Sequence, residues 1–259
     1  MRNLNHKLSS SITIIIPAFN ESSRITKALN DIDSYISKIS KPDLFQVIIV
    51  NDGSTDNTSG VVNGWIQNES KNKKCFQLTG YMPNRGKGYA VNLGFLKASN
   101  SIVLYTDADG AAPINEVQKL LEAIKSDYDA AIGSRVIKDK DTKVSMSFTR
   151  RLTGRVFHLV LSILGLASLK DTQCGFKLFR MDAAKKLAEN QKCFGFSFDI
   201  EYLFLLKKFG YKIKEVPINW YHIEGSKVNI FRDSVKMLVE VLKIRFLYKY
   251  NITDSGIKG

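Results

Sequence analysis

Residues 101–110 read SIVLYTDADG, an apolar run that ends in a threonine, two aspartates and a glycine. The apolar part, 101–105, is short and rich in β-branched and aromatic residues, which is typical of a strand buried on both faces. Runs of the same kind occur at 12–16, 45–50 and 130–132. We therefore expect several buried strands, and polar residues directly after three of them.

The segments between these runs have helical periodicity. Apolar residues recur every three or four positions over 22–39 and again over 115–124. Strands and helices in alternation predict an α/β fold, in which a mostly parallel sheet carries helices on both faces. Shorter strand-like runs at 75–78, 176–179 and 213–218 extend the pattern toward the C-terminus.

The domain organisation is expected to be simple. Residues 1–229 contain neither an internal repeat nor a low-complexity linker. A basic amphipathic segment follows at 230–259, and it belongs either to the same domain or to a contact with a membrane surface. With 259 residues and 44% hydrophobic residues, the chain is too apolar to be disordered. Three cysteines without a CxxC pair argue against a disulfide framework and against a structural zinc site.

Positive charge is concentrated in two stretches of the chain. The formal net charge is +13, and residues 135–155 carry seven basic against two acidic side chains, while residues 207–249 carry ten against four. Such asymmetry indicates an anionic partner, which could be nucleic acid, an anionic membrane or a phosphorylated substrate, or it reflects an ordinary solvated surface. Nucleic acid is disfavoured, because the acidic residues after the strands would repel a polyanion.

Four polar motifs follow or neighbour the predicted strands. In parallel sheets, ligands bind outside the carboxyl ends of the strands, so these motifs mark the candidate site. They are PAFNE (17–21), NDGSTD (51–56), RGKG (85–88) and DADG (107–110).

Asp107 and Asp109 are the candidate metal ligands. Two carboxylates at a strand end converge on a hard divalent cation, and magnesium commonly takes one or two carboxylates together with substrate phosphates. The alternative is a turn whose aspartates cap the next helix. Asp52 likewise fits either an acceptor for a base or a ribose hydroxyl, or an ordinary turn. Lys87, between two glycines, fits either a phosphate contact or a flexible loop.

The combination of motifs resembles the inverting GT-A glycosyltransferases of family 2, which transfer sugars from nucleotide-sugar donors. Within that family it is most similar to the dolichyl-phosphate β-glucosyltransferases, with the dolichol-phosphate mannose synthases as near relatives. The resemblance spans most of the chain. It is carried by RGKGYAVNLG (85–94), TDADGA (106–111), GSR (133–135), DTQCGFKLF (171–179), FDIE (198–201) and NWYHIEGSK (219–227).

The resemblance implies roles for residues of the donor site. The segment from Pro17 through Asn20 to Glu21 would hold the nucleoside together with Asp52. The DxD pair would hold Mg²⁺ or Mn²⁺ against the diphosphate, with Asp109 counted among the catalytic residues. Lys87 would meet a phosphate.

The resemblance also implies the residues that meet the acceptor. Arg135 would contact the acceptor phosphate or the diphosphate and act in catalysis. Arg151 would supply a second phosphate contact, with Arg150 and Arg155 as alternatives in the same basic stretch. A solvated helix face is the other explanation for these arginines. Substrate contacts are further expected from Gln173 in DTQCGF and from Trp220 in NWYHIEGSK, although a tryptophan alone is more often a core residue.

Asp199, with Glu201 beside it, occupies the place of the general base in family 2 enzymes that act on hydroxyls. A sugar hydroxyl benefits from such a carboxylate. A lipid phosphate is already an anion and needs cations instead, to offset its repulsion by the donor diphosphate. With a lipid phosphate, Asp199 would orient the sugar or an arginine. A helix cap after Phe198 is the structural alternative.

The expected function is an inverting, metal-dependent transfer of a hexose to a dolichyl or other polyprenyl phosphate, with UDP-glucose as the favoured donor. Alternatives are GDP-mannose as the donor, a hydroxyl of a surface glycan as the acceptor, or a nucleotide-sugar-binding protein without catalysis. No stretch reaches the roughly 18 apolar residues of a membrane span. We expect a cytoplasmic protein in peripheral contact with the cytoplasmic face of a membrane through 156–169 or 230–248, and no nucleic-acid partner.

Overall fold

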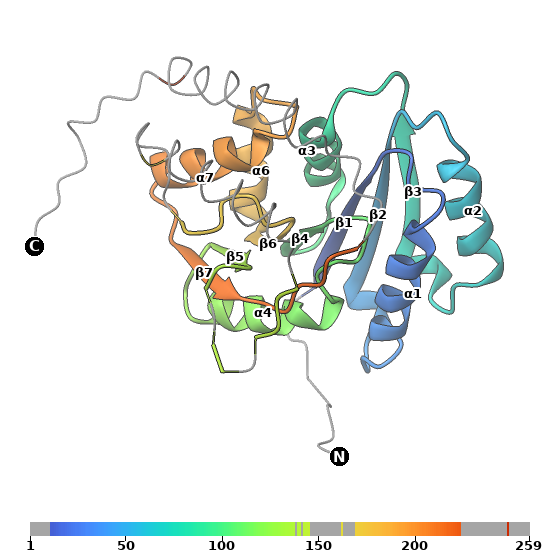
Figure 1. Cartoon of the computed structure of the whole chain (residues 1–259), viewed down its shortest axis with the longest axis horizontal. Coiled ribbons are helices and arrows are strands. Elements are labelled where there is room, and N and C mark those ends of the chain that lie inside the picture. Colours follow the sequence, from blue (N-terminus) through green and yellow to red (C-terminus); the bar gives the residue numbers. More distant parts are fainter. Residues whose placement is uncertain are drawn as a thin grey trace, which may run out of the picture.

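The computed structural model describes residues 11–137, 139–140, 142–145, 162, 169–223 and 248 (Figure 1). Within these residues one seven-stranded sheet has the order β3-β2-β1-β4-β6-β5-β7. Its strands are β1 (Ile12–Ala18), β2 (Phe45–Asp52), β3 (Phe76–Tyr81), β4 (Ile102–Thr106), β5 (Ala130–Ser134), β6 (Phe176–Arg180) and β7 (Ile213–Pro217). Every strand predicted from the apolar runs is therefore present.

The sheet is mostly parallel, as predicted, with one antiparallel strand. β1 pairs in parallel with β2 and β4, β2 with β3, and β5 with β7. β6 runs antiparallel between β4 and β5, so that Thr106 lies opposite Phe176. Because β6 is reversed, the loop that precedes it, residues 171–175, lies at the carboxyl edge of the parallel strands and reaches Asp107.

Helices cover both faces of the sheet, as expected. Side chains of β1 alternate between the faces: Ile14 and Ile16 pack in one hydrophobic cluster and Ile15 in the other. Helices α1 (Ile25–Ile36), α2 (Thr58–Asn68) and α4 (Val117–Lys125) bury their apolar side chains in the first cluster. Helices α3 (Lys87–Lys97), α6 (Met181–Asn190) and α7 (Phe198–Lys208) bury theirs in the second.

The predicted helix boundaries shift slightly. The helix expected over 22–39 is α1, which begins only at Ile25 because residues 21–24 form a turn in which the Glu21 carbonyl accepts from two backbone amides. The helix expected over 115–124 starts as a short 3-10 turn, Ile114–Glu116, and continues as α4.

The proposed boundary at residues 229 and 230 lies outside the described residues. Of the segment 230–259 the structure describes Tyr248, whose hydroxyl donates to the Asn190 carbonyl at 2.8 Å and to Glu201 at 2.6 Å. Its ring lies 5.2 Å from that of Phe204 on α7. This residue therefore packs on the domain. Among the helices described, none is long and apolar enough to cross a membrane.

Candidate active site

The loops after β1 and β2 form one unit at the carboxyl edge of the sheet, and Asn20 joins them. Its backbone amide donates to Ser54 Oγ at 2.9 Å, and its side-chain oxygen accepts from the amides of Thr55 at 2.7 Å and Asp56 at 3.2 Å. Asn20 adopts a positive φ of 55°, which asparagine tolerates better than most residues. Pro17 lies buried within β1, opposite Val50. Asn20 thus joins the loops after β1 and β2, and Pro17 belongs to the strand before them.

Asp52 organises the loop that carries the RGKG motif. Its side chain is 2% exposed, and one oxygen, Oδ1, accepts from the Tyr81 hydroxyl at 2.7 Å and from the amides of Arg85 at 2.8 Å and Gly86 at 3.2 Å. Burial and the neighbouring Asp52 raise the pKa of Tyr81, so the phenol remains a donor. The backbone of Gly53 (φ 65°) lies so close to Asn84 that a Cβ would sit 2.4 Å from its nitrogen. The Asp52 carboxylate therefore stabilises the loop that carries the RGKG motif, and it is also a candidate contact for the nucleoside.

Glu21 forms an ion pair with Arg24. Arg24 Nη2 donates to Glu21 Oε1 at 2.6 Å, and a second bond joins Nε to Oε2. The hydrogen bond that Arg24 donates to Glu21, helped by the charges of Glu21, Asp109 and Asp107, raises the pKa of Arg24 although burial opposes it. The pattern of the sequence did not single out Arg24, yet this residue lies directly before α1, and its cation is within electrostatic reach of the DxD pair.

Asp107 and Asp109 directly follow β4 at the carboxyl edge of the sheet. The Asp107 amide donates to the Gly175 carbonyl at 3.1 Å, and Asp107 Oδ1 lies 2.5 Å from Lys87 Nζ. Asp109 Oδ1 accepts from the Ala111 amide at 3.0 Å. Burial and the neighbouring Asp107 raise the pKa of the Asp109 carboxyl. Two carboxylates therefore share one site and repel each other, which a bound cation would relieve.

These two aspartates fit a divalent cation. Their donors are hard oxygens, and Lys87 shows that a cationic group reaches Asp107. In the part of the chain that is described, no group of three His, Cys, Asp or Glu side chains is arranged as a metal site. The pair therefore suits Mg²⁺ or Mn²⁺ that completes its coordination with substrate phosphate oxygens and water. Asp109 closes a local turn through its bond to the Ala111 amide but caps no helix, because the next helical turn begins only at Ile114 and has no side-chain cap.

Lys87 is the first residue of α3, and its side chain connects the loop of the RGKG motif with the DxD pair. Burial opposes its charge, but attraction by Asp107 and Asp199 raises the pKa of Lys87. Its ammonium lies 5.7 Å from the centre of the Tyr105 ring. Gly86, directly before it, has a φ of 100°, and a Cβ there would sit 2.4 Å from the Phe194 carbonyl oxygen. The α6–α7 loop thus closes tightly over the start of α3.

Arg135 is held by Asp171, which the sequence analysis did not single out. The guanidinium donates to both carboxylate oxygens, at 2.8 Å and 2.7 Å, and the Arg135 amide donates at 2.9 Å. Although burial acts in the opposite direction, Arg135 lowers the pKa of Asp171, and Asp171 raises that of Arg135. The guanidinium also lies 5.6 Å from the Trp220 ring. Arg135 is thus preorganised within electrostatic reach of Asp107.

Trp220 and Gln173 lie in the two loops around this arginine. Trp220 is 7% exposed, and its backbone pairs with that of Lys143 and Ser145 at 2.9 Å. The next amide, of Tyr221, donates to the Ala111 carbonyl at 2.9 Å, which ties the segment to the DxD loop. Gln173 is half-buried in the loop before β6. Arg151, together with Arg150 and Arg155, lies outside the described residues, so its predicted role stays a prediction.

Asp199 and Glu201 are both buried and engaged. Asp199 lies within the first turn of α7 and does not cap it, so the helix-cap alternative is wrong. It accepts from Lys177 Nζ and from the Tyr105 hydroxyl. Burial and the Asp199 charge raise the pKa of Tyr105, which keeps this phenol protonated. Glu201 accepts from the amides of Lys192 and Cys193, both at 2.9 Å, and holds the loop before α7.

One signal in the sequence could have identified Lys177. It interrupts the apolar run FKLF of β6, a strand whose first four residues are all buried. A lysine in such a strand is buried only if it is paired. Its partner Asp199 lies 22 positions away, so local patterns do not reveal it.

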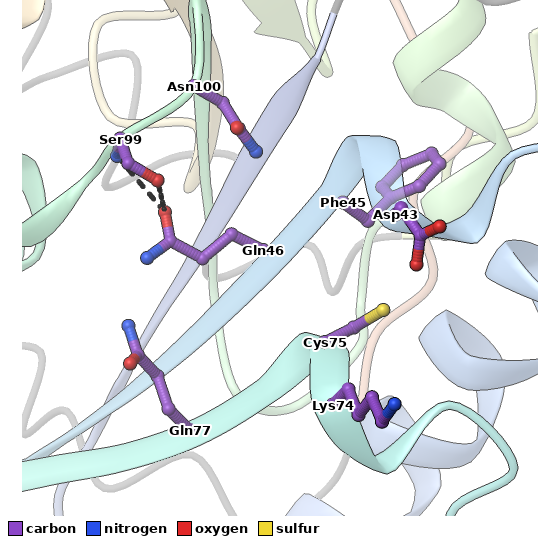
Figure 2. A pocket seen from close by; sticks show the side chains of 8 residues that line it. All are labelled: Asp43, Phe45, Gln46, Lys74, Cys75, Gln77, Ser99 and Asn100. Atoms are coloured by element: carbon purple, nitrogen blue, oxygen red, sulfur yellow. Dashed lines mark hydrogen bonds between the residues drawn. The ribbon is translucent and has the colours of Figure 1, made fainter.

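A cavity also lies at the opposite edge of the sheet, by the amino ends of β2 and β3 (Figure 2). Its volume is about 250 Å³. The Ser99 hydroxyl and amide donate to Gln46 Oε1 at 3.0 and 3.1 Å within it. Burial raises the pKa of the Cys75 thiol, so this cysteine is a poor nucleophile. The cavity is lined by Asp43, Phe45, Gln46, Lys74, Cys75, Gln77, Ser99 and Asn100.

Comparisons with known proteins show the family to which the chain belongs. Residues 13–188 match the model of the family described as glycosyl transferase family 2. A dolichyl-phosphate β-glucosyltransferase of Dictyostelium discoideum is 36% identical over 250 residues, covering 93% of this chain and 76% of that protein. The enzymes of the same name from Saccharomyces cerevisiae and Homo sapiens are 36% identical (95% and 78% covered) and 32% identical (93% and 76% covered).

Solved structures share the fold. Glucosyl-3-phosphoglycerate synthase from Mycobacterium tuberculosis, in complex with Mn²⁺, UDP and phosphoglyceric acid, superposes with a TM-score of 0.69 at 17% identity, covering 96% of this chain and 81% of that one. The same enzyme with Mg²⁺ and UDP also has a TM-score of 0.69, at 17% identity over 96% of this chain and 82% of that one. The α/β architecture is thus that of the GT-A glycosyltransferases. From its family match, its relatives and its DxD site, this chain belongs to the family 2 glycosyltransferases, in the group of the dolichyl-phosphate β-glucosyltransferases.

Proposed function

We propose that the chain transfers glucose from UDP-glucose to a dolichyl or other polyprenyl phosphate, with inversion at the anomeric carbon and with Mg²⁺ or Mn²⁺ bound at Asp107 and Asp109. The observation that carries the proposal is the set of three cations around two carboxylates at one sheet edge. Lys87 contacts Asp107, and Arg24 and Arg135 lie within electrostatic reach of it. The acceptor and the sugar are inferred from the names of the relatives, and the donor from the resemblance and from solved complexes of a protein with the same fold.

In the proposed reaction an acceptor phosphate oxygen attacks the anomeric carbon of glucose while the bond from that carbon to the UDP oxygen breaks. The bound cation would neutralise the charge that develops on the departing diphosphate. Arg135, held rigid by Asp171, would offset the repulsion between the acceptor phosphate and the diphosphate. Asp52 would keep the loop before Lys87 in the shape that a phosphate requires. GDP-mannose and a hydroxyl acceptor are not favoured by an observation in the structure.

The test is transfer of radiolabelled sugar into an organic-extractable product, with polyprenyl phosphate, Mn²⁺ and either UDP-glucose or GDP-mannose. We expect label from UDP-glucose and none after chelation. Asp107→Asn should lower kcat by at least about 100-fold, because electrostatic stabilisation of the leaving group is lost. The matched control is Asp31→Asn, which removes an exposed carboxylate of α1 paired with Lys27 and should leave the rate unchanged. Label in a water-soluble glycan, or label only from GDP-mannose, would contradict the proposal.

We further propose that the carboxyl edge of the sheet meets the cytoplasmic face of a membrane, since a polyprenyl phosphate is embedded there. Several large apolar side chains are exposed in loops at this edge, and the exposed Arg85 and Lys192 are within three residues of two of them in the chain. A surface that combines exposed apolar side chains with basic ones suits an anionic lipid surface. The apolar side chains are Phe19, Met82, Val136, Phe194, Phe196 and Tyr221, with exposures from 38% to 68%.

A further inference from the structure

Lys177 is a buried cation for which the proposed transfer has no direct use. It lies in β6 opposite Tyr105 of β4, and none of its surface is exposed. An ammonium group is found in such a place only with partners that offset the loss of water. The partners of Lys177 therefore indicate why the residue is there.

The ammonium joins three elements beneath the DxD pair. It forms an ion pair with Asp199 Oδ1 of α7, and it donates to the Thr172 carbonyl at 2.9 Å in the loop before β6. The Tyr105 hydroxyl donates to the same oxygen of Asp199. Asp199 is 4% exposed. One oxygen of this carboxylate thus has two strong donors inside the protein.

The network lies close to the reacting groups. Tyr105 lies in β4, two residues before Asp107. The loop that contains Thr172 also contains Gly175, whose carbonyl accepts from the Asp107 amide at 3.1 Å. Lys87, which contacts Asp107, is also attracted by Asp199, and the ammonium groups of Lys87 and Lys177 both lie 5.7 Å from the centre of the Tyr105 ring. Asp199 is therefore a carboxylate within electrostatic reach of the DxD site, and Lys177 is its ion-pair partner.

We propose that Lys177 is a specificity-determining residue that keeps Asp199 engaged in a buried ion pair, so that this carboxylate does not serve as a general base and the site takes acceptors that arrive already ionised. To accept a proton, Asp199 would have to give up its attraction to Lys177 and leave that ammonium buried without a counter-charge, which is strongly unfavourable. A phosphate acceptor needs no base, whereas water and sugar hydroxyls do. The inference rests on the proposed function and names the feature that restricts its acceptor.

Removing the ammonium group that pairs with Asp199 should allow a side reaction, the hydrolysis of UDP-glucose. In Lys177→Met, a water oxygen would attack the anomeric carbon, the bond from that carbon to the UDP oxygen would break, and the proton of water would pass to Asp199. The products are glucose and UDP. Release of glucose from UDP-glucose with Mn²⁺ and no lipid therefore measures the role of Lys177 directly, and it does not depend on which acceptor is natural.

The experiment compares Lys177→Met, the double variant Lys177→Met with Asp199→Asn, and Lys177→Arg. The exposed Lys207→Met on α7 is the matched control for the loss of a lysine charge. We expect glucose release to rise at least about tenfold in Lys177→Met and to return to the wild-type rate in the double variant, in Lys177→Arg and in the control. Transfer to polyprenyl phosphate in the double variant should stay within about tenfold of wild type.

Two results would overturn the proposal. One is unchanged glucose release in a folded Lys177→Met. The other is a loss of at least about 100-fold in the double variant with an unchanged Tm, the effect of removing a general base. Should Lys177→Met unfold, the double variant, which removes both charges of the buried pair, decides by itself between the same two rates of lipid transfer. If wild type transfers no sugar to polyprenyl phosphate while the pattern of glucose release holds, the proposed acceptor fails and the role of Lys177 stands.

Discussion

At the scale of single residues, the site depends on charges that hold one another in place. Arg135 and Asp171 are 36 positions apart, and Asp171's side chain is 4% exposed, against 19% for Arg135. Breaking such a pair from one side leaves an uncompensated charge. Arg135 is therefore preorganised by a carboxylate that is itself almost fully buried.

Asp171→Asn should lower the free energy of unfolding by about 3–5 kcal/mol at pH 7, because Arg135 loses its counter-charge in a buried setting. The pKa of Asp171 is lowered from its ordinary value of 3.8, so its contribution is complete above that pH and is lost as the pH falls below it. Urea unfolding of wild type and variant should give a constant difference between pH 7 and pH 4.5 and a smaller one below pH 3.8. A difference that already shrinks between pH 7 and pH 5 would contradict this assignment.

At the scale of elements, the reversed strand β6 delivers a loop to the DxD pair. Gly175 lies so close to Asp107 that a Cβ would sit 2.0 Å from Asp107 Oδ2. Since the Asp107 amide also donates to the Gly175 carbonyl, the loop and the carboxylate move together. The position of the loop before β6 therefore determines the orientation of the Asp107 carboxylate.

Gly175→Ala should displace the Asp107 carboxylate and lower metal-dependent transfer at least about tenfold, while the fold survives. The matched control is Gly64→Ala in α2, where a Cβ meets no atom within 4 Å. That change should leave the rate unchanged and raise the free energy of unfolding by about 0.5–1 kcal/mol, the helix preference of alanine over glycine. Transfer rates over a Mn²⁺ titration, together with urea unfolding, distinguish the effects of the two variants. Equal activity of Gly175→Ala and Gly64→Ala would show that the close approach of Gly175 to Asp107 is unimportant.

At the scale of the whole molecule, charge and exposed apolar side chains together point toward a lipid surface. With a net charge of +13, the protein should float with vesicles that contain phosphatidylserine, and high salt should weaken that binding. Changing both Met82 and Phe196 to serine should lower the bound fraction at least about fivefold. Leu96→Ser, which removes an exposed apolar side chain near the far end of α3, is the control and should have no effect. Equal binding of all variants would contradict the proposed orientation.

The sequence by itself determined the strands, the helices and the placement of the DxD and RGKG motifs, because periodicity and turn residues depend on neighbours within a few positions. It also predicted Asp52 at the site, through its position at the end of a strand, and Arg135 through the resemblance of its GSR motif. Only the tertiary structure decided what those residues contact. Asn20 and Asp52 turned out to bridge loops, and Asp199 turned out to be paired with Lys177.

These pairings depend on strand order and register. The insertion of β6 between β4 and β5 places Lys177 beside Tyr105, although 72 positions separate them in the chain, and α7 then brings Asp199 to both. A pattern of apolar residues carries no information about such distant partners, since many strand orders bury the same side chains equally well. The ion pairs inside the core can therefore be identified only from the assembled sheet.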